Sequence, residues 1–220
     1  MKKLSLVLMG AISLFTLQSK AQSQQVEVGG TTFGVRAGVN FQNINGKDGD
    51  NRNLENKLKT GFHFGVNAEI PVAPDFYVQP GLLFTTKGTK YDDFDDATLN
   101  LSYLELPVNF LYKPTLGVGK LIVGFGPYLA YGLGGKLKND DDEIDVKFKS
   151  KIGDEPDKIY LKPFDAGANF VAGYEFSNRF SAQLNAQLGL VNIESKSESL
   201  PDDDSKSKNT GFGVSVGYRF

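Results

Sequence analysis

Alternation of apolar and polar residues with a period of two recurs along most of this chain, and it restricts the possible folds more than any other feature. The last ten residues, GFGVSVGYRF (211–220), show it most plainly, because every second residue from Phe212 to Phe220 is apolar or aromatic. Helical periodicity is hard to find elsewhere. A segment of this kind is a strand with one apolar face. That face either packs against a core or lies against lipid.

Eight segments share the pattern, and each has about the 9–11 residues that a tilted strand needs to cross a bilayer. They are 33–41, 62–70, 76–85, 103–112, 121–131, 164–176, 180–190 and 211–220. The connections 71–75, 113–120 and 177–179 are short, whereas 42–60, 87–99, 132–162 and 192–210 are longer and polar. Short and long connections alternate, which is typical of outer-membrane barrels with short periplasmic turns and long external loops.

The first 21 residues have the layout of a secretory signal peptide. Lys2 and Lys3 precede an apolar run over 4–17, and Ser19-Lys20-Ala21 forms a small-x-small cleavage site. No later apolar run is long enough for a helical span, so a membrane location requires a closed barrel. We therefore expect a signal peptide at 1–21 and, over 22–220, an all-β domain: an eight-stranded antiparallel up-and-down transmembrane β-barrel in the outer membrane.

Composition narrows the possible chemistry. The chain has no cysteine and a single histidine, His63, and its formal net charge of −2 comes without a basic block. Disulfide or thiolate chemistry is therefore impossible, a histidine-rich metal site is not expected, and nucleic acid is not an expected partner. We expect no cofactor.

The less apolar face of each segment distinguishes a membrane barrel from a soluble one. It consists of Gly, Asn, Gln, Ser and a few charged residues, which suits the narrow interior of an eight-stranded barrel. A soluble lipid-binding barrel, with its apolar residues inside, is the alternative. Pro80, Pro107 and Pro127 each lack a ladder donor, so we expect bulges or interrupted pairing near them.

Aromatic residues favour the membrane interpretation because they gather near the two ends of the segments. Near the periplasmic ends lie Phe33, Phe76, Phe176, Phe180, Tyr218 and Phe220, and near the external ends lie Phe41, Phe62, Phe84, Tyr131 and Phe164. Two aromatic girdles are typical of outer-membrane barrels.

Inward-facing charged residues are predicted at two levels. Arg36, Glu69, Glu175 and Arg219 fall toward the periplasmic end, and His63, Lys87, Glu105 and Asp165 fall toward the outside. A desolvated lone charge costs several kcal/mol. We therefore expect the four lower residues to form a structural network that closes the lumen.

The sequence supports catalysis, calcium binding and diffusion less well than a structural role. His63 with Ser102 and Glu105 could form a catalytic site only if strand pairing brings them within hydrogen-bond reach. The acidic runs at 92–96, 140–143 and 202–204 lack the spacing of a calcium loop and contain neighbouring lysines. Eight strands leave little open lumen for a diffusion pore. The expectation is a protein that is not an enzyme.

Four motifs resemble the PorT-like outer-membrane barrels of Bacteroidetes. They are SYLELPVNFLYKP (102–114), GFGPYLAYGLGGK (124–136), KPFDAGANFVAGYEF (162–176) and GVRAGVNFQNI (34–44), in the order of that family. The resemblance implies an eight-stranded barrel with no catalytic residues to carry over. It leaves two roles open: a structural or loop-mediated binding barrel, and an accessory component of a protein-secretion apparatus.

The end of the chain also resembles the signal by which barrel-assembly machinery recognises its clients. Tyr218 and the terminal Phe220 carry that resemblance. The expected partners are therefore outer-membrane lipid, the assembly machinery during insertion, and possible surface or secretion partners at the external loops. We expect the barrel to be a monomer.

Overall fold

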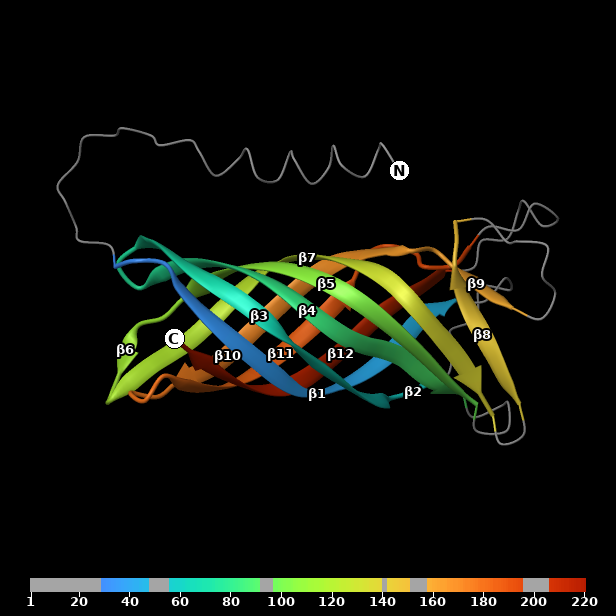
Figure 1. Ribbon diagram of the computed structural model, residues 1–220, viewed down its shortest axis with the longest axis horizontal. Coiled ribbons are helices and arrows are strands. Elements are labelled where there is room, and N and C mark those ends of the chain that lie inside the picture. Colours follow the sequence, from blue (N-terminus) through green and yellow to red (C-terminus); the bar gives the residue numbers. More distant parts are fainter. Residues whose placement is uncertain (1–28, 48–55, 92–96, 140–141, 151–157, 196–205) are drawn as a thin grey trace.

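The computed structural model describes residues 29–47, 56–91, 97–139, 142–150, 158–195 and 206–220. The predicted signal peptide and the acidic runs at 92–96 and 202–204 lie outside these residues. Eight long antiparallel strands surround one lumen (Figure 1). They are β1 (Thr32–Lys47), β3 (Lys59–Ala73), β4 (Phe76–Tyr91), β5 (Thr98–Tyr112), β7 (Gly119–Lys138), β10 (Phe164–Glu175), β11 (Phe180–Gly189) and β12 (Lys206–Arg219).

The barrel is closed because the first and last strands pair with each other. β1 pairs with β3 on one side and with β12 on the other, from Gly34 opposite Arg219 to Lys47 opposite Lys206. Each of the eight predicted segments corresponds to one strand, and several strands continue beyond the prediction at their external ends. No helix in the described ranges is long and apolar enough to cross a membrane. The eight-stranded antiparallel barrel is thus confirmed.

The three short connections all lie at the end of the barrel that carries the C-terminus (Figure 1). Asp75 and Arg179 adopt φ values of 60° and 68° in the β3–β4 and β10–β11 turns. The third connection contains β6 (Thr115–Leu116), which forms a small hairpin with the start of β7. By the usual arrangement of outer-membrane barrels, this is the periplasmic end.

The opposite, external end is built up by further strand structure. β2 (Asn56–Lys57) pairs with the end of β4, and β8 (Glu143–Phe148) returns along the end of β7. β9 (Ile159–Leu161) then lies parallel to β8. Much of the predicted 132–162 connection is therefore strand that extends the barrel wall, as the right-hand side of Figure 1 shows.

Pairing is interrupted beside the three wall prolines, as the sequence predicts. The β4–β5 ladder has no paired residues between Pro80 and Leu83, and the β5–β7 ladder has none between Pro107 and Phe110. Pro127 lies opposite this second gap, and the alternation of side chains continues in phase on both sides of it. Missing N–H donors thus cost local pairing without changing which residues face the lumen.

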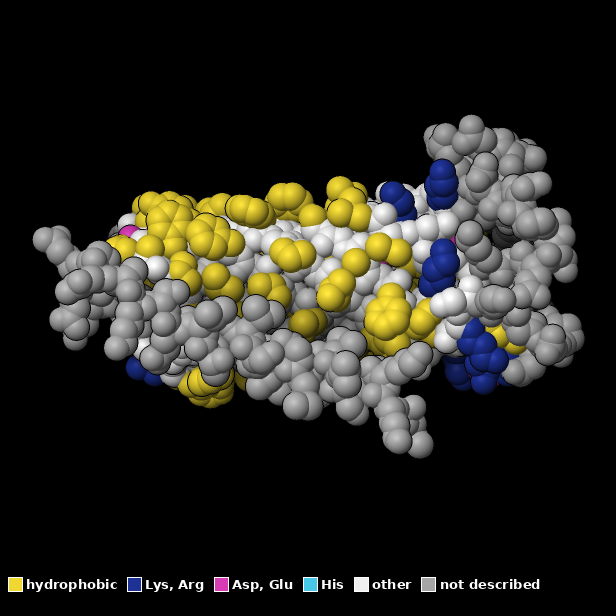
Figure 2. Space-filling view, turned by 90° about the horizontal axis from the view of Figure 1, so that it is seen from above, with side chains coloured by type: hydrophobic (Ala, Val, Ile, Leu, Met, Phe, Trp, Pro, Cys, Tyr) yellow, Lys and Arg dark blue, Asp and Glu magenta, His cyan; other side chains and the backbone are white. Residues whose placement is uncertain are grey.

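The outer wall of the barrel is apolar, and its lumen is mostly polar apart from a small buried cluster of Leu111, Ile122 and Val171. Phe125 and Leu129 on β7 are 59% and 60% exposed, whereas the intervening Tyr128 is 1% exposed. Figure 2 shows apolar side chains over the length of the wall, with lysine and arginine gathered at the external end. The apolar face therefore points away from the lumen, which contradicts the soluble barrel with an apolar interior.

Aromatic side chains form contacts at both ends of the wall. At the periplasmic end the ring centroids of Phe76 and Tyr112, and those of Phe180 and Tyr218, lie 4.9 Å apart. Toward the outside, Tyr131 packs edge-on against Phe164 at 5.3 Å. Other external contacts join Phe41 to Phe212 and Phe62 to Phe84. The two predicted girdles are therefore present as contacting rings.

Candidate functional site

Inward-facing side chains divide the lumen into three levels. A lower network lies near the periplasmic end, an upper network lies toward the outside, and an apolar cluster with a cavity lies beyond that. The lower network consists of Glu69, Lys113, Glu175 and Arg219, and the upper network of Lys87, Glu105, Tyr128 and Asp165.

Two cations and two carboxylates alternate in the lower network. Lys113 Nζ lies 2.8 Å from both Glu69 Oε2 and Glu175 Oε2. Arg219 Nη2 lies 2.8 Å from Glu69 Oε1, and its Nε lies 3.6 Å from Glu175 Oε2. Because Glu69 is 2% exposed, its charge is compensated by these partners and not by bulk water.

The sequence prediction for this network was right for three residues and wrong for Arg36. Glu69 pairs in register with Thr32, so Arg36 lies four residues farther along β1, about 13 Å at the usual rise per residue. Arg36 is 7% exposed and has no ion pair within the described part of the chain. Its Nε and Nη1 have no hydrogen-bond partner there.

Lys113 takes the place that the prediction gave to Arg36. It was missed because it follows the last residue of β5 and was assigned to a connection. Odd-numbered residues of β5 face the lumen, as buried Asn109 and Leu111 show, and Lys113 continues that phase. Its backbone N–H donates to the Asp75 carbonyl at 2.7 Å, which fixes it beside the β3–β4 turn. Extending the alternation of β5 from Leu111 by two residues would have predicted that Lys113 faces the lumen.

The upper network centres on a lysine with no exposed surface. Lys87 Nζ lies 3.0 Å from Glu105 Oε2 and 3.1 Å from Asp165 Oδ2. It also lies 4.2 Å from the centroid of the Tyr128 ring, a favourable cation–π distance. Two amides complete the shell: Gln187 Nε2 donates to Glu105 at 2.6 Å, and Asn209 Nδ2 donates to Asp165 at 2.9 Å.

His63 faces the lumen but does not join this network. It lies opposite Gly38 on β1 and Thr85 on β4, and its Nε2 has no partner among the described residues. Ser102 lies on the outward face of β5, whereas Glu105 lies on the inward face. The arrangement of His63, Ser102 and Glu105 considered for catalysis is therefore not formed.

Amide side chains fill the lumen between the two networks. Asn169 Nδ2 donates to Asn109 Oδ1 at 2.9 Å, and Asn40 Nδ2 donates to Thr85 Oγ1 at 3.1 Å. Asn109 is 1% exposed. Its polar side chain, on a strand rich in aliphatic residues, is explained by this cross-lumen hydrogen bond.

Two acidic residues of the external extension, Glu143 and Asp145, form ion pairs. Glu143 pairs with Lys136 and, at 2.7 Å, with Lys138, and Asp145 pairs with Lys158 at 3.0 Å. Hydrogen bonds from Lys136 and Lys138 lower the pKa of the Glu143 carboxyl. No group of three histidine or acidic side chains with metal-binding geometry occurs within the described ranges.

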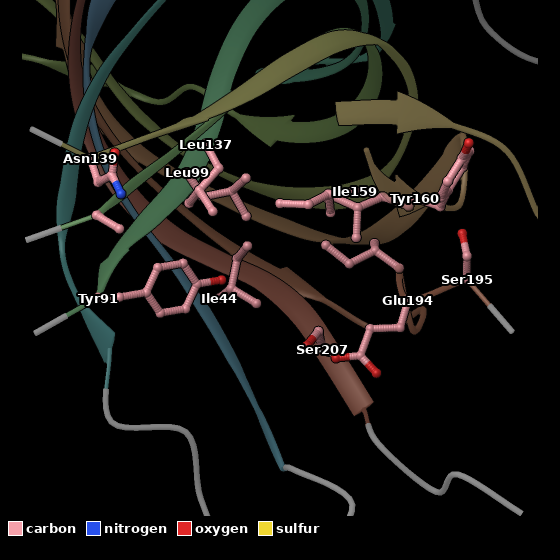
Figure 3. A pocket seen from close by; sticks show the side chains of 13 residues that line it. Ile44, Tyr91, Leu99, Leu137, Asn139, Ile159, Tyr160, Glu194, Ser195 and Ser207 are labelled. Atoms are coloured by element: carbon pink, nitrogen blue, oxygen red, sulfur yellow. Dashed lines mark hydrogen bonds between the residues drawn. The ribbon is translucent and has the colours of Figure 1, made fainter. Parts of the chain in front are cut away.

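Above the upper network the interior becomes apolar. Ile44, Leu99, Leu101, Val146, Leu161 and Ile193 form a buried cluster with Tyr103, Tyr128 and Ala130. A cavity of about 650 Å³ opens among them (Figure 3). Its lining residues are Ile44, Tyr91, Ala97, Leu99, Leu137, Asn139, Ile159, Tyr160, Leu161, Ile193, Glu194, Ser195 and Ser207. Sequence reasoning missed this cavity, because its walls come from six strands and three connections.

The residues considered as an assembly signal lie at the periplasmic rim. Phe220 is 62% exposed, and its N–H donates to the Phe33 carbonyl at 2.8 Å. The ring of Tyr218 packs edge-on against that of Phe220, with centroids 5.4 Å apart. The chain end is thus attached to the wall while both rings remain on its surface.

Several solved structures are similar to this chain at low sequence identity. No curated protein matches the sequence. Similar solved structures include Ail, the attachment invasion locus protein of Yersinia pestis, at 15% identity, covering 87% of this chain and 100% of that one with a TM-score of 0.42. Neisserial surface protein A is 11% identical, and the match covers 87% of this chain and 100% of that one with a TM-score of 0.48. A major outer membrane protein from Thermus thermophilus is 15% identical, and the match covers 86% of this chain and 99% of that one with a TM-score of 0.45.

The decisive match is to a protein family. Residues 20–195 match the family described as outer membrane protein beta-barrel domain. The match covers most of the chain and agrees with the closed barrel, its apolar outer wall and its two aromatic girdles. This protein therefore belongs to the outer membrane protein beta-barrel domain family and is located in the outer membrane.

Proposed function

We propose that this protein is a closed, non-catalytic barrel that binds a ligand at its external end. The observation that carries the proposal is the apolar cavity, which lies above a lumen blocked by buried side chains. Its volume of about 650 Å³ falls within the range of about 300–1,000 Å³ common for small-molecule sites. Mostly apolar walls with a few polar groups are also typical of such sites.

The lumen beneath the cavity supports binding in preference to passage. Tyr103, Lys87 and Tyr128 have exposures of 0%, 0% and 1%, so water does not reach them from either end. A solute passing through would have to separate Lys87 from its two carboxylates, each about 3 Å away. Breaking a buried ion pair is costly. These buried side chains therefore close the cavity on its periplasmic side.

The polar groups at the cavity support a role without catalysis. Activated nucleophiles usually need a base that a third group orients. Here the Ser207 hydroxyl donates to the Glu194 carboxyl, and His63 is not among the lining residues. We therefore assign Glu194 and Ser207 to recognition.

Native mass spectrometry of protein extracted from outer membranes tests the proposal. Wild type should retain a small molecule that Ala97→Phe retains less well, because Ala97 lines the cavity and a phenyl group there would take up part of its volume. Ala182→Phe is the matched control, since Ala182 is exposed on the outer wall. Both variants and wild type should show no steady conductance in planar bilayers. Equal retention by all three proteins, or a steady wild-type conductance, would contradict the proposal.

An accessory role in protein secretion is the second candidate, and the resemblance to PorT-like barrels supports it. The β7–β8 extension offers this role a strand pair at the external end of the barrel. Stoichiometric co-purification of a secretion component would favour it. The two roles differ in the Ala97→Phe variant, because filling an internal cavity should leave a surface partner bound.

We further propose that Tyr218 and Phe220 direct insertion by the barrel-assembly machinery. Deleting Phe220 should reduce the amount of protein in the outer membrane strongly, while detergent-refolded protein keeps its heat-modifiable gel mobility. Normal membrane levels of the deletion variant would contradict this role.

A further inference from the structure

Lys87 of the upper network contacts two carboxyl groups in a place from which bulk water is excluded. The side chains of Lys87 and Asp165 have no exposed surface, and that of Glu105 is 2% exposed. Lys87 Nζ lies 3.1 Å from Asp165 Oδ2, which is bonded to the carboxyl carbon. Separations of about 3–3.5 Å are typical of groups that are positioned to react. The ion pair therefore holds an amine nitrogen beside a carbon that could accept it.

The carboxyl group of Asp165 accepts hydrogen bonds that suit it to be attacked. Its Oδ2 accepts from Asn209 Nδ2 at 2.9 Å and from the Tyr128 hydroxyl at 3.3 Å. Asn209 and Tyr128 are each 1% exposed, so both donors are fixed inside the lumen. Negative charge builds up on a carboxyl oxygen when a nucleophile adds to its carbon, and donors already in place stabilise that charge. The surroundings therefore favour Asp165 as the acceptor of an amine.

Glu105, the second carboxyl group beside Lys87, is placed to move protons. Its Oε2 lies 3.0 Å from Lys87 Nζ, and Gln187 Nε2 donates to its other oxygen, Oε1, at 2.6 Å. The Gln187 amide therefore fixes the orientation of the carboxylate and leaves Oε2 directed at the amine. A carboxylate within hydrogen-bond reach of a nitrogen can take a proton from it and pass that proton to a departing oxygen.

We propose that Lys87 and Asp165 condense to an intramolecular amide bond, with Glu105 transferring the protons. Glu105 first carries one proton from the Lys87 ammonium group to the Asp165 carboxylate, and the neutral nitrogen then forms a bond to Asp165 Cγ. A second proton moves from the nitrogen through Glu105 to the same carboxyl oxygen, the C–O bond breaks, and water leaves. The amide nitrogen keeps the third proton and Glu105 returns to its starting state, so the step needs no oxidant, reductant or cofactor.

The amide bond joins β4 to β10 across the lumen. These strands are separated in the wall by β5 and β7, and the two residues by 78 positions in the chain. A cross-link that closes so long a loop stabilises a fold mainly by restricting the unfolded chain. Exclusion of bulk water favours the amide, because water is the product that leaves. The reaction occurs once in each chain, so it is a self-modification that does not depend on the ligand proposed for the cavity.

Refolding of the full chain from urea into detergent, followed by mass spectrometry of the denatured protein, tests the proposal. Wild type should lose about 18 Da, the mass of one water, as it folds, because the covalent step releases one water. Protease digestion should then give a branched peptide that joins Lys87 to Asp165. Wild type that gains heat-modifiable gel mobility but keeps its full mass would overturn the proposal, and so would a branched peptide that joins Lys87 to Glu105.

Two variants separate the covalent step from the ion pair. Lys87→Arg keeps a positive charge but should lose no mass, because a guanidinium is not deprotonated in proteins. Glu105→Gln should slow the loss of mass at least about a hundredfold, the lower end of the usual contribution of general acid–base catalysis. Glu175→Gln, in the lower network, is the matched control and should react at the wild-type rate.

A loss of water from Lys87→Arg would place the amide at another lysine and overturn the assignment. Loss of mass by Glu105→Gln at the wild-type rate would exclude Glu105 as the proton carrier. Should Glu105→Gln fail to fold, the masses of wild type and Lys87→Arg still decide whether the bond forms.

Discussion

The same strands follow opposite rules in their membrane and external parts. On β5, the outward residues Leu106 and Phe110 are apolar and the inward Glu105 and Asn109 are polar. A few residues farther out, the outward Asn100 is polar and the inward Leu101 is completely buried. The change falls at the irregularity between Ser102 and Tyr103, where β5 shifts register against β7.

The difference shows that the polarity of the inward-facing side chains depends on whether lipid or water surrounds that part of the barrel. Lipid outside leaves the polar side chains for the lumen, where they must be paired. Water outside allows an ordinary apolar core. The β1–β12 and β4–β5 ladders extend from the membrane part into the external part, so one chain combines a membrane barrel with a small core of the soluble type. The cavity belongs to the second of these.

Removing the central cation of the polar lumen should have the largest effect. Lys87→Met leaves the Glu105 and Asp165 carboxylates buried without their partner, and we expect a loss of about 4 kcal/mol in the free energy of unfolding. Urea unfolding in detergent micelles, followed by heat-modifiable gel mobility, measures it. Lys90→Met is the control, because Lys90 lies on the same strand but is exposed. Similar unfolding midpoints for the two variants would show that the buried charges are not balanced by Lys87.

Placing a lysine on the outward face of β5 tests the comparison directly. Leu106→Lys should cost about 3 kcal/mol because it exposes a charge to hydrocarbon. Asn100→Lys, on the same face in the external part, should change stability by less than about 0.5 kcal/mol. Unfolding in lipid vesicles provides the measurement. Equal costs would mean that the boundary between the two parts lies elsewhere.

The lower network should tolerate loss of its lysine better than the upper one. In Lys113→Met, Arg219 remains 2.8 Å from Glu69, so we expect a cost of about 2 kcal/mol, near that of one charged hydrogen bond. The same urea experiment compares it with Lys87→Met. A larger loss for Lys113→Met would reverse the proposed ranking of the two networks.

The smallest effect is expected at the exposed β7–β8 pair. Lys136 and Lys138 lower the pKa of Glu143, so their contribution is present above the pKa of an unfolded glutamate and is lost as the pH falls through the lower, folded-state value. An NMR titration of the Glu143 carboxyl should give a midpoint below that of an unfolded peptide. Lys136→Met should move the midpoint upward without measurably changing the urea midpoint. A titration unaffected by this substitution would exclude the pairing in solution.

Much of the fold could be predicted from the sequence, because the period-two pattern directly indicates where the membrane strands lie. Strands 33–41 and 180–190 were readable from alternation alone, and the prolines marked the interrupted ladders. The external extension was not readable, since Lys136 and Lys138 face water there and the segment resembles a polar loop. Alternation shows that a strand has an apolar face and a polar face. Which of the two faces points into the barrel depends on whether lipid or water lies outside.

The lumen could be predicted only in part. Glu69, Glu175 and Arg219 were placed together correctly from their height along the strands, whereas Arg36 required the register between β1 and β3. Glu194 and Ser207 could not be identified, because their contact forms across the β11–β12 connection, where the period-two pattern gives no information. The position of a residue along its own strand can be estimated from the sequence. Which residues meet across the barrel also depends on the register between neighbouring strands, which the sequence does not show.

Closure of the wall by β1 and β12 has a consequence for the order of events in biogenesis. Gly34 cannot meet Arg219 until β12 has been made, so the seam joins two strands that are separated by most of the barrel domain. Contacts of such large sequence separation form slowly. Until then, a partial sheet in lipid would leave two rows of backbone groups unpaired, each costing several kcal/mol. The wall is therefore stable in lipid only once β12 has paired with β1 and both edges are closed.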